Sequence, residues 1–171
     1  MTAESAARAA QAVLGHLARC ADFSDASCVA LYAALPGEVP TRPCFELLRE
    51  RGAETLFPRI ETDGLAFCSV ARWEDLEPGR YGVLEPPRAA ALRRLEEADL
   101  VLVPGLAFDA QGNRLGQGKG YYDAALPALG VGPPIVGMAH AFQVLAQVPH
   151  GSRDRRVDAI VTENGMQWCT P

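Results

Sequence analysis

The residues best suited to chemistry in this sequence lie in one stretch, 112–123, which reads GNRLGQGKGYYD. Gly116, Gly118 and Gly120 fall at alternate positions, and glycine lets a backbone approach a ligand without a Cβ in the way. Successive backbone N–H groups exposed in this manner can face one anion. Arg114 adds a planar fork of donors and Lys119 adds a point charge, so the stretch indicates a site for phosphate.

Neither of the two common nucleotide-binding signatures accounts for this stretch. A Walker A loop needs Ser or Thr after its Gly-Lys pair, whereas Gly120 follows Lys119, and Asn113 stands in place of the first glycine. A Rossmann fingerprint needs G-x-G-x-x-G, and Tyr121 stands where the third glycine belongs. The spacing by itself leaves two interpretations open, an anion-binding loop and a plain flexible loop with solvated charges.

An aspartate follows the glycines at the start of a predicted helix. The N-terminus of a helix carries partial positive charge and attracts phosphate groups. Asp123 lies in the first turn of that helix, where its carboxylate can hold Mg²⁺ against a triphosphate. The stretch therefore predicts a site for a nucleoside triphosphate and its magnesium ion.

The hydrophobic pattern predicts helices and strands that alternate along the chain and position this loop. Apolar spacing and end signals predict helices over 3–19, 41–52, 86–98 and 121–130, the last interrupted or ended near Pro127. Apolar runs predict strands over 28–34, 53–60, 65–70, 99–105, 134–139 and 157–163, with a tight turn between the second and the third.

The strands that begin at 28, 99, 134 and 157 are apolar without alternation, as strands buried on both faces should be. Together with the alternating helices, this pattern predicts one α/β domain over residues 1–171, Rossmann-like, with a mainly parallel sheet and flanking helices. Ligands of such sheets bind beyond the carboxyl ends of the strands. The loops over 33–41 and 104–120 lie at such ends.

Composition narrows the class of protein further. The formal net charge of -5 argues against general nucleic-acid binding, which depends on clustered Lys and Arg. The five cysteines are odd in number and form no C-x-x-C pair, which argues against a disulfide framework and fits a reducing cytoplasm. No signal-peptide pattern opens the chain, and no apolar run reaches the roughly 20 residues of a membrane helix. We expect a cytoplasmic monomer that acts on a small molecule and binds neither nucleic acid nor membrane.

A longer stretch around the glycines, VPGLAFDAQGNRLGQGKGYYD (103–123), resembles the signature of the 5-formyltetrahydrofolate cyclo-ligase family, also called 5,10-methenyltetrahydrofolate synthetases. The resemblance extends from about residue 28 to residue 163. Four more segments are similar to family motifs in the same order: LYAALPGEVPT (31–41), LFPRI (56–60), YGVLEP (81–86) and QVPHGSRDRRVDAIVTE (147–163).

The resemblance implies a cytosolic enzyme with an α/β fold related to those of sugar-phosphate isomerases and CoA transferases. Family members use ATP and Mg²⁺ to close 5-formyltetrahydrofolate, with or without a polyglutamate tail, into 5,10-methenyltetrahydrofolate. ADP and phosphate are released. Transfer of the γ-phosphoryl group to the formyl oxygen would allow N10 to attack, so positioning and charge stabilisation would dominate catalysis.

The resemblance also implies roles for individual residues. Glu38 would bind the pterin, and Asp123 and Asp154 would hold Mg²⁺. Without the resemblance, Glu38 has the pattern of an exposed loop acid and Asp154 that of a solvated charge cluster. Lys119, Arg114 and Tyr121 would take part in catalysis. The residues that would wrap the phosphates of ATP are Arg114, Leu115, Gly116, Gln117, Gly118, Lys119, Gly120, Tyr121 and Tyr122, and residues 117–121 would also face the formyl group and the pterin.

Two other residues have open roles. Arg59 could approach a phosphate or form a surface ion pair. His140 would serve as an acid or base only if it faced the binding pocket, and it is otherwise a satisfied histidine near a strand end.

The sequence departs from the family near its start. Family members usually open with a basic helix whose Lys and Arg contact ATP, whereas the first twenty residues offer only Arg8 and Arg19, and Lys119 is the only lysine in the sequence. A start codon assigned too late, a different way of holding ATP, or weak ATP binding would each explain this. Two other functions stay open: a relative that binds folate or nucleotide without turnover, and a different enzyme of this fold, such as a sugar-phosphate isomerase.

Overall fold

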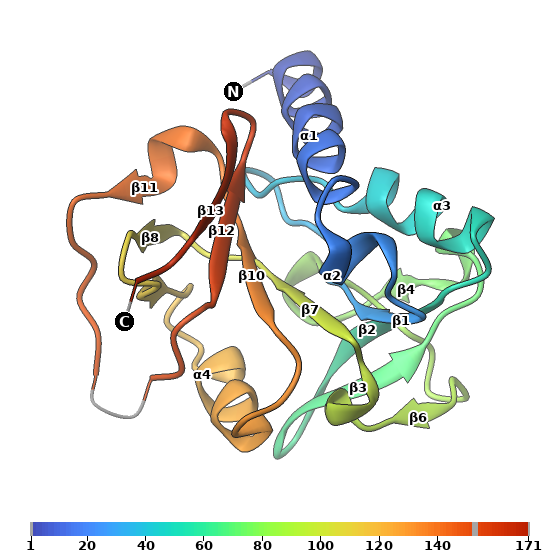
Figure 1. The fold of residues 1–171 in the computed structure, drawn as a ribbon. Coiled ribbons are helices and arrows are strands. Elements are labelled where there is room, and N and C mark those ends of the chain that lie inside the picture. Colours follow the sequence, from blue (N-terminus) through green and yellow to red (C-terminus); the bar gives the residue numbers. More distant parts are fainter. Residues whose placement is uncertain (1, 152–153, 171) are drawn as a thin grey trace.

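The computed structural model of the protein describes residues 2–151 and 154–170, and its main feature is an eight-stranded sheet with helices on both faces (Figure 1). The strands lie in the order β13-β12-β10-β7-β1-β2-β3-β6. The strands from β12 to β2 in this order run parallel, whereas β13 on one side and β3 and β6 on the other pair antiparallel. The mainly parallel α/β sheet predicted from the apolar strands is confirmed.

The elements have the following bounds. The strands of the large sheet are β1 (Cys28–Ala30), β2 (Glu54–Glu61), β3 (Gly64–Ser69), β6 (Leu92–Arg93), β7 (Leu100–Val103), β10 (Ile135–Met138), β12 (Ala159–Thr162) and β13 (Gly165–Trp168). The α-helices are α1 (Ala3–Leu17), α2 (Ala21–Ser24), α3 (Arg42–Glu50) and α4 (Tyr121–Ala125). Two smaller sheets consist of β8 (Ala107–Asp109), β9 (Arg114–Leu115) and β11 (Val144–Leu145), and of β4 (Glu77–Pro78) and β5 (Leu84–Glu85).

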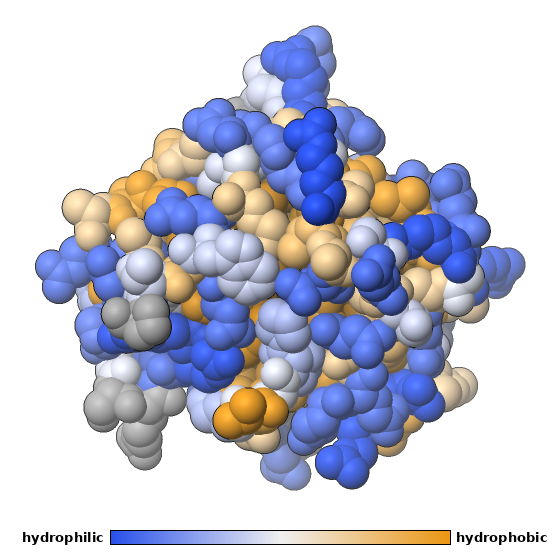
Figure 2. Space-filling view, viewed as in Figure 1, coloured by the Kyte–Doolittle hydropathy of each residue, from blue (hydrophilic) through white to orange (hydrophobic). Residues whose placement is uncertain are grey.

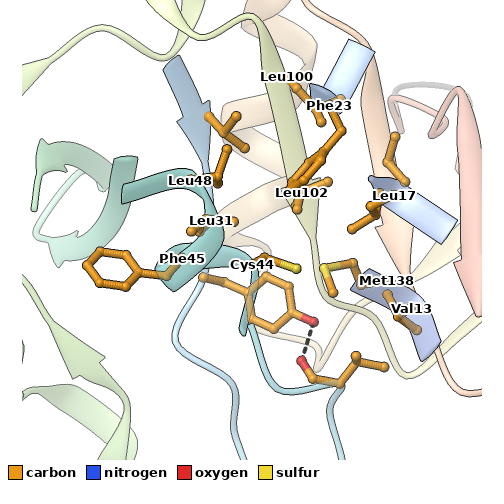
Figure 3. Packing of buried hydrophobic residues seen from close by; sticks show 14 of the residues in the cluster. Val13, Leu17, Phe23, Leu31, Cys44, Phe45, Leu48, Leu100, Leu102 and Met138 are labelled. Carbon is orange, nitrogen blue, oxygen red and sulfur yellow. Dashed lines mark hydrogen bonds between the residues drawn. The ribbon is translucent and has the colours of Figure 1, made fainter. Parts of the chain in front are cut away.

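Helices α1, α2 and α3 cover one face of the large sheet (Figures 1 and 3). Helix α1 begins after Thr2, whose hydroxyl accepts a hydrogen bond from the backbone N–H of Ser5 at 3.2 Å and so caps the helix. Val13 and Leu17, one helical turn apart, are fully buried and belong to the same core as Met138 of β10. The apolar stripe predicted for residues 3–19 thus faces the sheet.

Alternate residues of β7 point to opposite faces of the sheet, and both sets are buried. Leu100 and Leu102 belong to the core beneath α1, α2 and α3, whereas Val101 and Val103 belong to a second core on the other face. That second core contains Phe108 and the 3-10 turn Leu126–Leu129 that continues α4. Burial on both faces explains why this strand is apolar without alternation.

The prediction of a helix over residues 86–98 is wrong. Residues 92–93 form β6, and Leu95–Glu97 form a single 3-10 turn. The physical reason is the outer edge of β3, whose unpaired backbone groups need partners. Ser69 donates its backbone N–H to the carbonyl of Ala91 at 2.9 Å, and β6 continues the pairing. The hydrophobic pattern of residues 86–98 alone could not predict this pairing with a distant strand.

The other predicted elements agree with the structure apart from their ends. The strand predicted from residue 28 is shorter than expected, because β1 ends at Ala30 and the chain continues into the 33–41 loop. Helix α4 ends before Pro127, as predicted, and a 3-10 turn follows. The tight turn between β2 and β3 is confirmed by the pairing of Glu61 with Gly64. None of the helices in the described part of the chain is long and apolar enough to cross a membrane.

One apolar area lies on the surface over β11 and the 3-10 turn Ala141–Gln143 (Figure 2). Phe142 and Leu145 are exposed there. Neither residue lines the cavity at the carboxyl ends of β1 and β7, which contains most of the predicted site residues.

Candidate active site

The cavity has a volume of about 190 Å³ and lies where the chain leaves β1 and β7. These two strands are neighbours in the sheet, so the loops 33–41 and 104–120 meet at the position predicted from the strand order. The wall comes from five segments: Tyr32, Ala33, Leu35 and Glu38; Pro58, Ile60 and Leu65; Tyr81, Val83 and Glu85; Pro104 and Gly105; and Arg114, Gly116, Gln117, Lys119, Gly120, Tyr121, Tyr122 and Asp123.

The 31–41 loop is held by hydrogen bonds between its own residues. Tyr32 donates its hydroxyl to the carbonyl of Val39 at 2.9 Å, and the Thr41 hydroxyl donates to the carbonyl of Tyr32. Val39 and Thr41 are fully buried, and Glu38, directly before Val39, lines the cavity. The hydroxyl contact of Thr41 accounts for the threonine at the end of the LYAALPGEVPT segment (31–41).

Glu38 is a carboxylate in a half-buried position at the cavity. Its Oε2 accepts a hydrogen bond from the backbone N–H of Leu35 at 2.8 Å, and its Oε1 accepts one from Gln117 at 2.9 Å. Burial raises the pKa of Glu38, and these two hydrogen bonds oppose that effect. A partly desolvated, charged acceptor of this kind is suited to a ligand that presents N–H donors.

The glycine loop is anchored at its start by a buried aspartate. Asp109 is fully buried and accepts hydrogen bonds from the backbone N–H groups of Gln111 and Asn113 at 3.1 Å and from the Asn113 amide at 2.9 Å. A fourth bond comes from the backbone N–H of Val148 at 2.9 Å. Burial alone would raise the pKa of Asp109, but the hydrogen bonds from Asn113, Val148 and Gln111 outweigh it and lower that pKa.

Two of the predicted glycines have backbone conformations that other residues rarely adopt. Gly118 has a φ of 76° and Gly120 a φ of 71°, both in the left-handed region. Gly120 precedes α4, which is only five residues long. The helix dipole therefore contributes less at this site than predicted, because a short helix aligns few peptide dipoles. The loop must rely more on its backbone N–H groups and on its side chains.

Arg114 and Asp123 form an ion pair with each other. The Arg114 guanidinium is nearly buried, donates to the carbonyl of Pro104 at 3.2 Å, and lies 5.4 Å from the centre of the Tyr122 ring. Asp123 is partly exposed at the cavity. The two residues for which the sequence predicts phosphate binding and metal binding are therefore adjacent, and each neutralises the other.

Asp123 is suited to the magnesium ion that the resemblance implies. Magnesium commonly takes one or two protein carboxylates and fills its other positions with water and substrate phosphates. No group of three or more His, Cys, Asp or Glu residues in the described part of the chain could form an all-protein metal cage. Asp154, the other predicted ligand, does not line the cavity and accepts a hydrogen bond from the backbone N–H of Gly151 at 2.6 Å. Asp123 thus fits a magnesium ion that takes most of its other ligands from water and substrate phosphates.

Lys119 lies above an aromatic ring that the sequence did not identify as a site residue. Its ammonium nitrogen is 4.7 Å from the centre of the Tyr81 ring. Tyr81 is exposed and is the only non-glycine residue of the described chain with positive φ, at 58°. A hydrogen bond with Tyr81 is also the main cause that raises the pKa of Tyr121. Tyr81 therefore connects the lysine with the tyrosine that follows the glycine loop.

The turn that carries Tyr81 is fixed by Glu85. This buried carboxylate accepts hydrogen bonds from the backbone N–H groups of Arg80 at 3.1 Å and Ile60 at 3.3 Å. Gly79 packs so closely against it that an added Cβ would lie 2.3 Å from its carboxyl carbon. Glu85 thus ties the 79–85 turn to β2, and both segments form part of the cavity wall. The E-P of the YGVLEP segment was the only sequence signal for this role.

Arg59 and His140, whose roles the sequence left open, do not line the cavity. Arg59 forms an ion pair with Glu61 at 2.6 Å and donates to the carbonyl of Pro87 at 2.8 Å. His140 is buried, and its ring stacks on Phe142 with centres 5.6 Å apart. Arg59 thus forms an ion pair, but its side chain is largely buried and not at the surface. His140 packs as a buried ring, although its Nε2 has no hydrogen-bond partner among the described residues, so it is not fully satisfied. Leu115 and Gly118 also lie outside the cavity wall.

The model of the 5-formyltetrahydrofolate cyclo-ligase family matches residues 1–163 of the chain. The chain belongs to this family. The match begins at residue 1, so α1 falls within the region that the family shares, beyond the span of 28–163 marked by the motifs. Members of the family are ATP-dependent ligases that act on folate.

Individual proteins of this family are also similar to the chain in sequence and in structure. The 5-formyltetrahydrofolate cyclo-ligase of Mycolicibacterium smegmatis is 28% identical over 140 residues, which cover 78% of this chain and 72% of that protein. The Escherichia coli protein of the same name is 30% identical over 146 residues, which cover 82% and 80%. The NMR structure of Aquifex aeolicus 5,10-methenyltetrahydrofolate synthetase matches 100% of this chain and 86% of that chain, with 32% identity and a TM-score of 0.87.

Proposed function

We propose that this cyclo-ligase family member catalyses the ATP- and Mg²⁺-dependent closure of 5-formyltetrahydrofolate to 5,10-methenyltetrahydrofolate, with release of ADP and phosphate. The observation that carries the proposal is the cavity, whose wall contains Glu38 from one loop and Lys119 and Arg114 from another. An acceptor for pterin N–H groups and a cationic, glycine-rich phosphate loop thus share one space. The names of its relatives in Mycolicibacterium smegmatis and Escherichia coli support the same reaction.

The chemistry requires two bond changes at the formyl group. The formyl oxygen attacks the γ-phosphorus of ATP, the bond to ADP breaks, and an iminium-like phosphate forms. N10 then attacks the formyl carbon and loses its proton, the C–O bond breaks, and phosphate leaves as the five-membered ring closes. Little covalent work remains for the protein, so orientation and charge stabilisation determine the rate.

The residues of the glycine loop have distinct roles in this reaction. The backbone N–H groups around Gly116 and Gly120 contact the phosphates, and Lys119 stabilises the charge that develops on the transferred phosphoryl group. Arg114 holds its loop against Asp123, and its positive charge becomes available to the phosphates when Asp123 binds Mg²⁺. Tyr121 and Tyr122 form the wall on the substrate side. Mg²⁺ bound by Asp123 and, as the resemblance implies, by Asp154 would neutralise charge on the phosphates of ATP.

One assay tests the proposal directly. The purified protein is mixed with 5-formyltetrahydrofolate, ATP and Mg²⁺, and the ultraviolet absorbance of the methenyl product is followed. We expect product that depends on both nucleotide and metal. Binding of folate or nucleotide without product would favour a relative without turnover, and the absence of both binding and product would contradict the proposal.

Glu38→Gln tests the folate side of the cavity. The substitution removes the negative charge but keeps the size, so one charge-assisted contact to the pterin weakens by about 1.5–3 kcal/mol. The KM for 5-formyltetrahydrofolate should rise about 10- to 100-fold, while the KM for ATP changes little. Glu46→Gln, an exposed glutamate of α3 that pairs with Arg42, is the matched control. An unchanged KM for the folate in Glu38→Gln would refute the pterin contact.

We further propose that residues 1–171 act as one domain and as a monomer in the cytoplasm. The odd number of cysteines and the lack of a C-x-x-C pair support a reducing compartment. Size-exclusion chromatography with light scattering tests the oligomeric state. A stable dimer at micromolar concentration would contradict it.

A further inference from the structure

Gln117 bridges the two loops that form the cavity. Its amide nitrogen donates a hydrogen bond to Oε1 of Glu38 at 2.9 Å, across 79 residues of sequence. Gln117 lies between Gly116 and Gly118, so the backbone on both sides of it lacks side chains. The contact therefore links the glycine loop with the 31–41 loop by one side chain.

Other polar groups near Glu38 do not replace this donor. Leu35 donates its backbone N–H to the second oxygen of the carboxylate, Oε2. The Tyr32 hydroxyl donates to the carbonyl of Val39, and the buried Tyr122 hydroxyl has no hydrogen-bond partner among the described residues. Gln117 is thus the side chain that holds Oε1 in the ligand-free protein.

The groups around Glu38 determine how much the Gln117 hydrogen bond affects the ionisation of this carboxylate. Tyr32 and Tyr122 both lie near Glu38, and burial raises the pKa of each, so both phenols are neutral near pH 7. Around them, Arg114 pairs with Asp123, and Lys119 lies over the Tyr81 ring. The remaining acid of the wall, Glu85, accepts hydrogen bonds from the 79–85 turn and from β2. Burial of Glu38 is therefore opposed mainly by the donors Leu35 and Gln117.

We propose that Gln117 is a positioning residue for Glu38: its amide holds the carboxylate in place and in its ionised form, ready to accept the N–H groups of the pterin. This inference rests on the proposed function and makes it more specific. The resemblance to the family assigned Gln117 to the substrate and the phosphates themselves. The geometry instead directs its amide toward the protein group that receives the substrate.

Gln117→Met is the decisive variant, because methionine has a similar length and no N–H donor. Without the Gln117 hydrogen bond, the ionised form of Glu38 is less stable, so its pKa rises further. The acid limb of kcat/KM for 5-formyltetrahydrofolate should move to higher pH by about one unit. Below that limb the variant should be about tenfold less efficient than the unmodified protein, and above it the two should converge. Gln117→Glu should shift the limb further, because two neighbouring carboxylates cannot both ionise readily.

A second measurement does not depend on turnover. The carboxyl carbon of Glu38 is titrated by NMR in the ligand-free protein, with Glu38→Gln used for assignment and Gln147→Met as an exposed control away from the cavity. The Glu38 titration should move upward in Gln117→Met and stay unchanged in Gln147→Met. An unchanged Glu38 titration in Gln117→Met would overturn the inference even if the enzyme were active. A KM for 5-formyltetrahydrofolate that rises equally at all pH values would also overturn it. A shifted titration in a protein without turnover would support the contact and contradict only the proposed reaction.

Discussion

Lys119→Ala is expected to lower kcat by about 100- to 1000-fold while the protein folds as before. The loss follows from the position of the ammonium group, which lies at the cavity on the glycine loop. Removal of one fixed donor to a developing charge commonly has an effect of this size. No other lysine in the sequence could take over, because Lys119 is the only one.

The fold should tolerate the substitution. Lys119 is exposed, and its contact with the Tyr81 ring contributes about 0.5–1 kcal/mol at an exposed site. The free energy of unfolding, measured with urea, should therefore fall by no more than about 1 kcal/mol. Arg94→Ala is the matched control, because Arg94 is an exposed cation outside the cavity wall. Near-normal turnover in Lys119→Ala, or an equal loss in Arg94→Ala, would contradict the phosphate role.

Lys119→Arg separates charge from geometry. If a point charge at this position is sufficient, the arginine variant should recover much of the lost turnover. If the compact ammonium group is needed, recovery should be small, because the planar guanidinium places its donors further from the backbone. Single-turnover measurements with saturating ATP would distinguish a defect in chemistry from a defect in nucleotide binding.

Most of the fold could be predicted from the sequence because the patterns that indicate its strands and helices lie within single segments. The apolar runs at 99–105, 134–139 and 157–163 are strands buried on both faces, and that burial is encoded in the run itself. The glycine loop and the 33–41 loop follow neighbouring strands, so the position of the cavity follows from the chain order.

The remaining features depend on contacts between distant segments. The edge of β3 recruits residues 91–93, and no periodicity within 86–98 indicates this pairing. Tyr81 enters the site only because Glu85 fixes its turn against β2. The partner of Arg114 is Asp123, although each residue alone suggested a separate ligand. Spacing identifies which residues belong to a site, but it does not identify which of them bind each other.

Asp109→Asn is expected to destabilise the protein by about 2–3 kcal/mol, the usual cost when a buried, charged acceptor loses its partners. Asp109 accepts four hydrogen bonds, from Gln111, Asn113 and Val148, with two on each oxygen. Asparagine keeps one oxygen and places an NH₂ group against two donors. Because these bonds hold the start of the glycine loop, turnover should fall together with stability.

The pH dependence of this loss identifies its cause. Hydrogen bonding lowers the pKa of Asp109 in the folded protein, so its contribution is fully present above the unfolded pKa of about 3.9. It is lost as pH falls through the lower, folded value. The difference in unfolding free energy between the unmodified protein and Asp109→Asn should therefore be constant from pH 7 to pH 5 and shrink below about pH 4. Asp63→Asn, in the exposed turn between β2 and β3, should show almost no difference at any pH, since aspartate and asparagine both suit turns. A difference for Asp109→Asn that persists unchanged in acid would mean that packing, not the charge, anchors the loop.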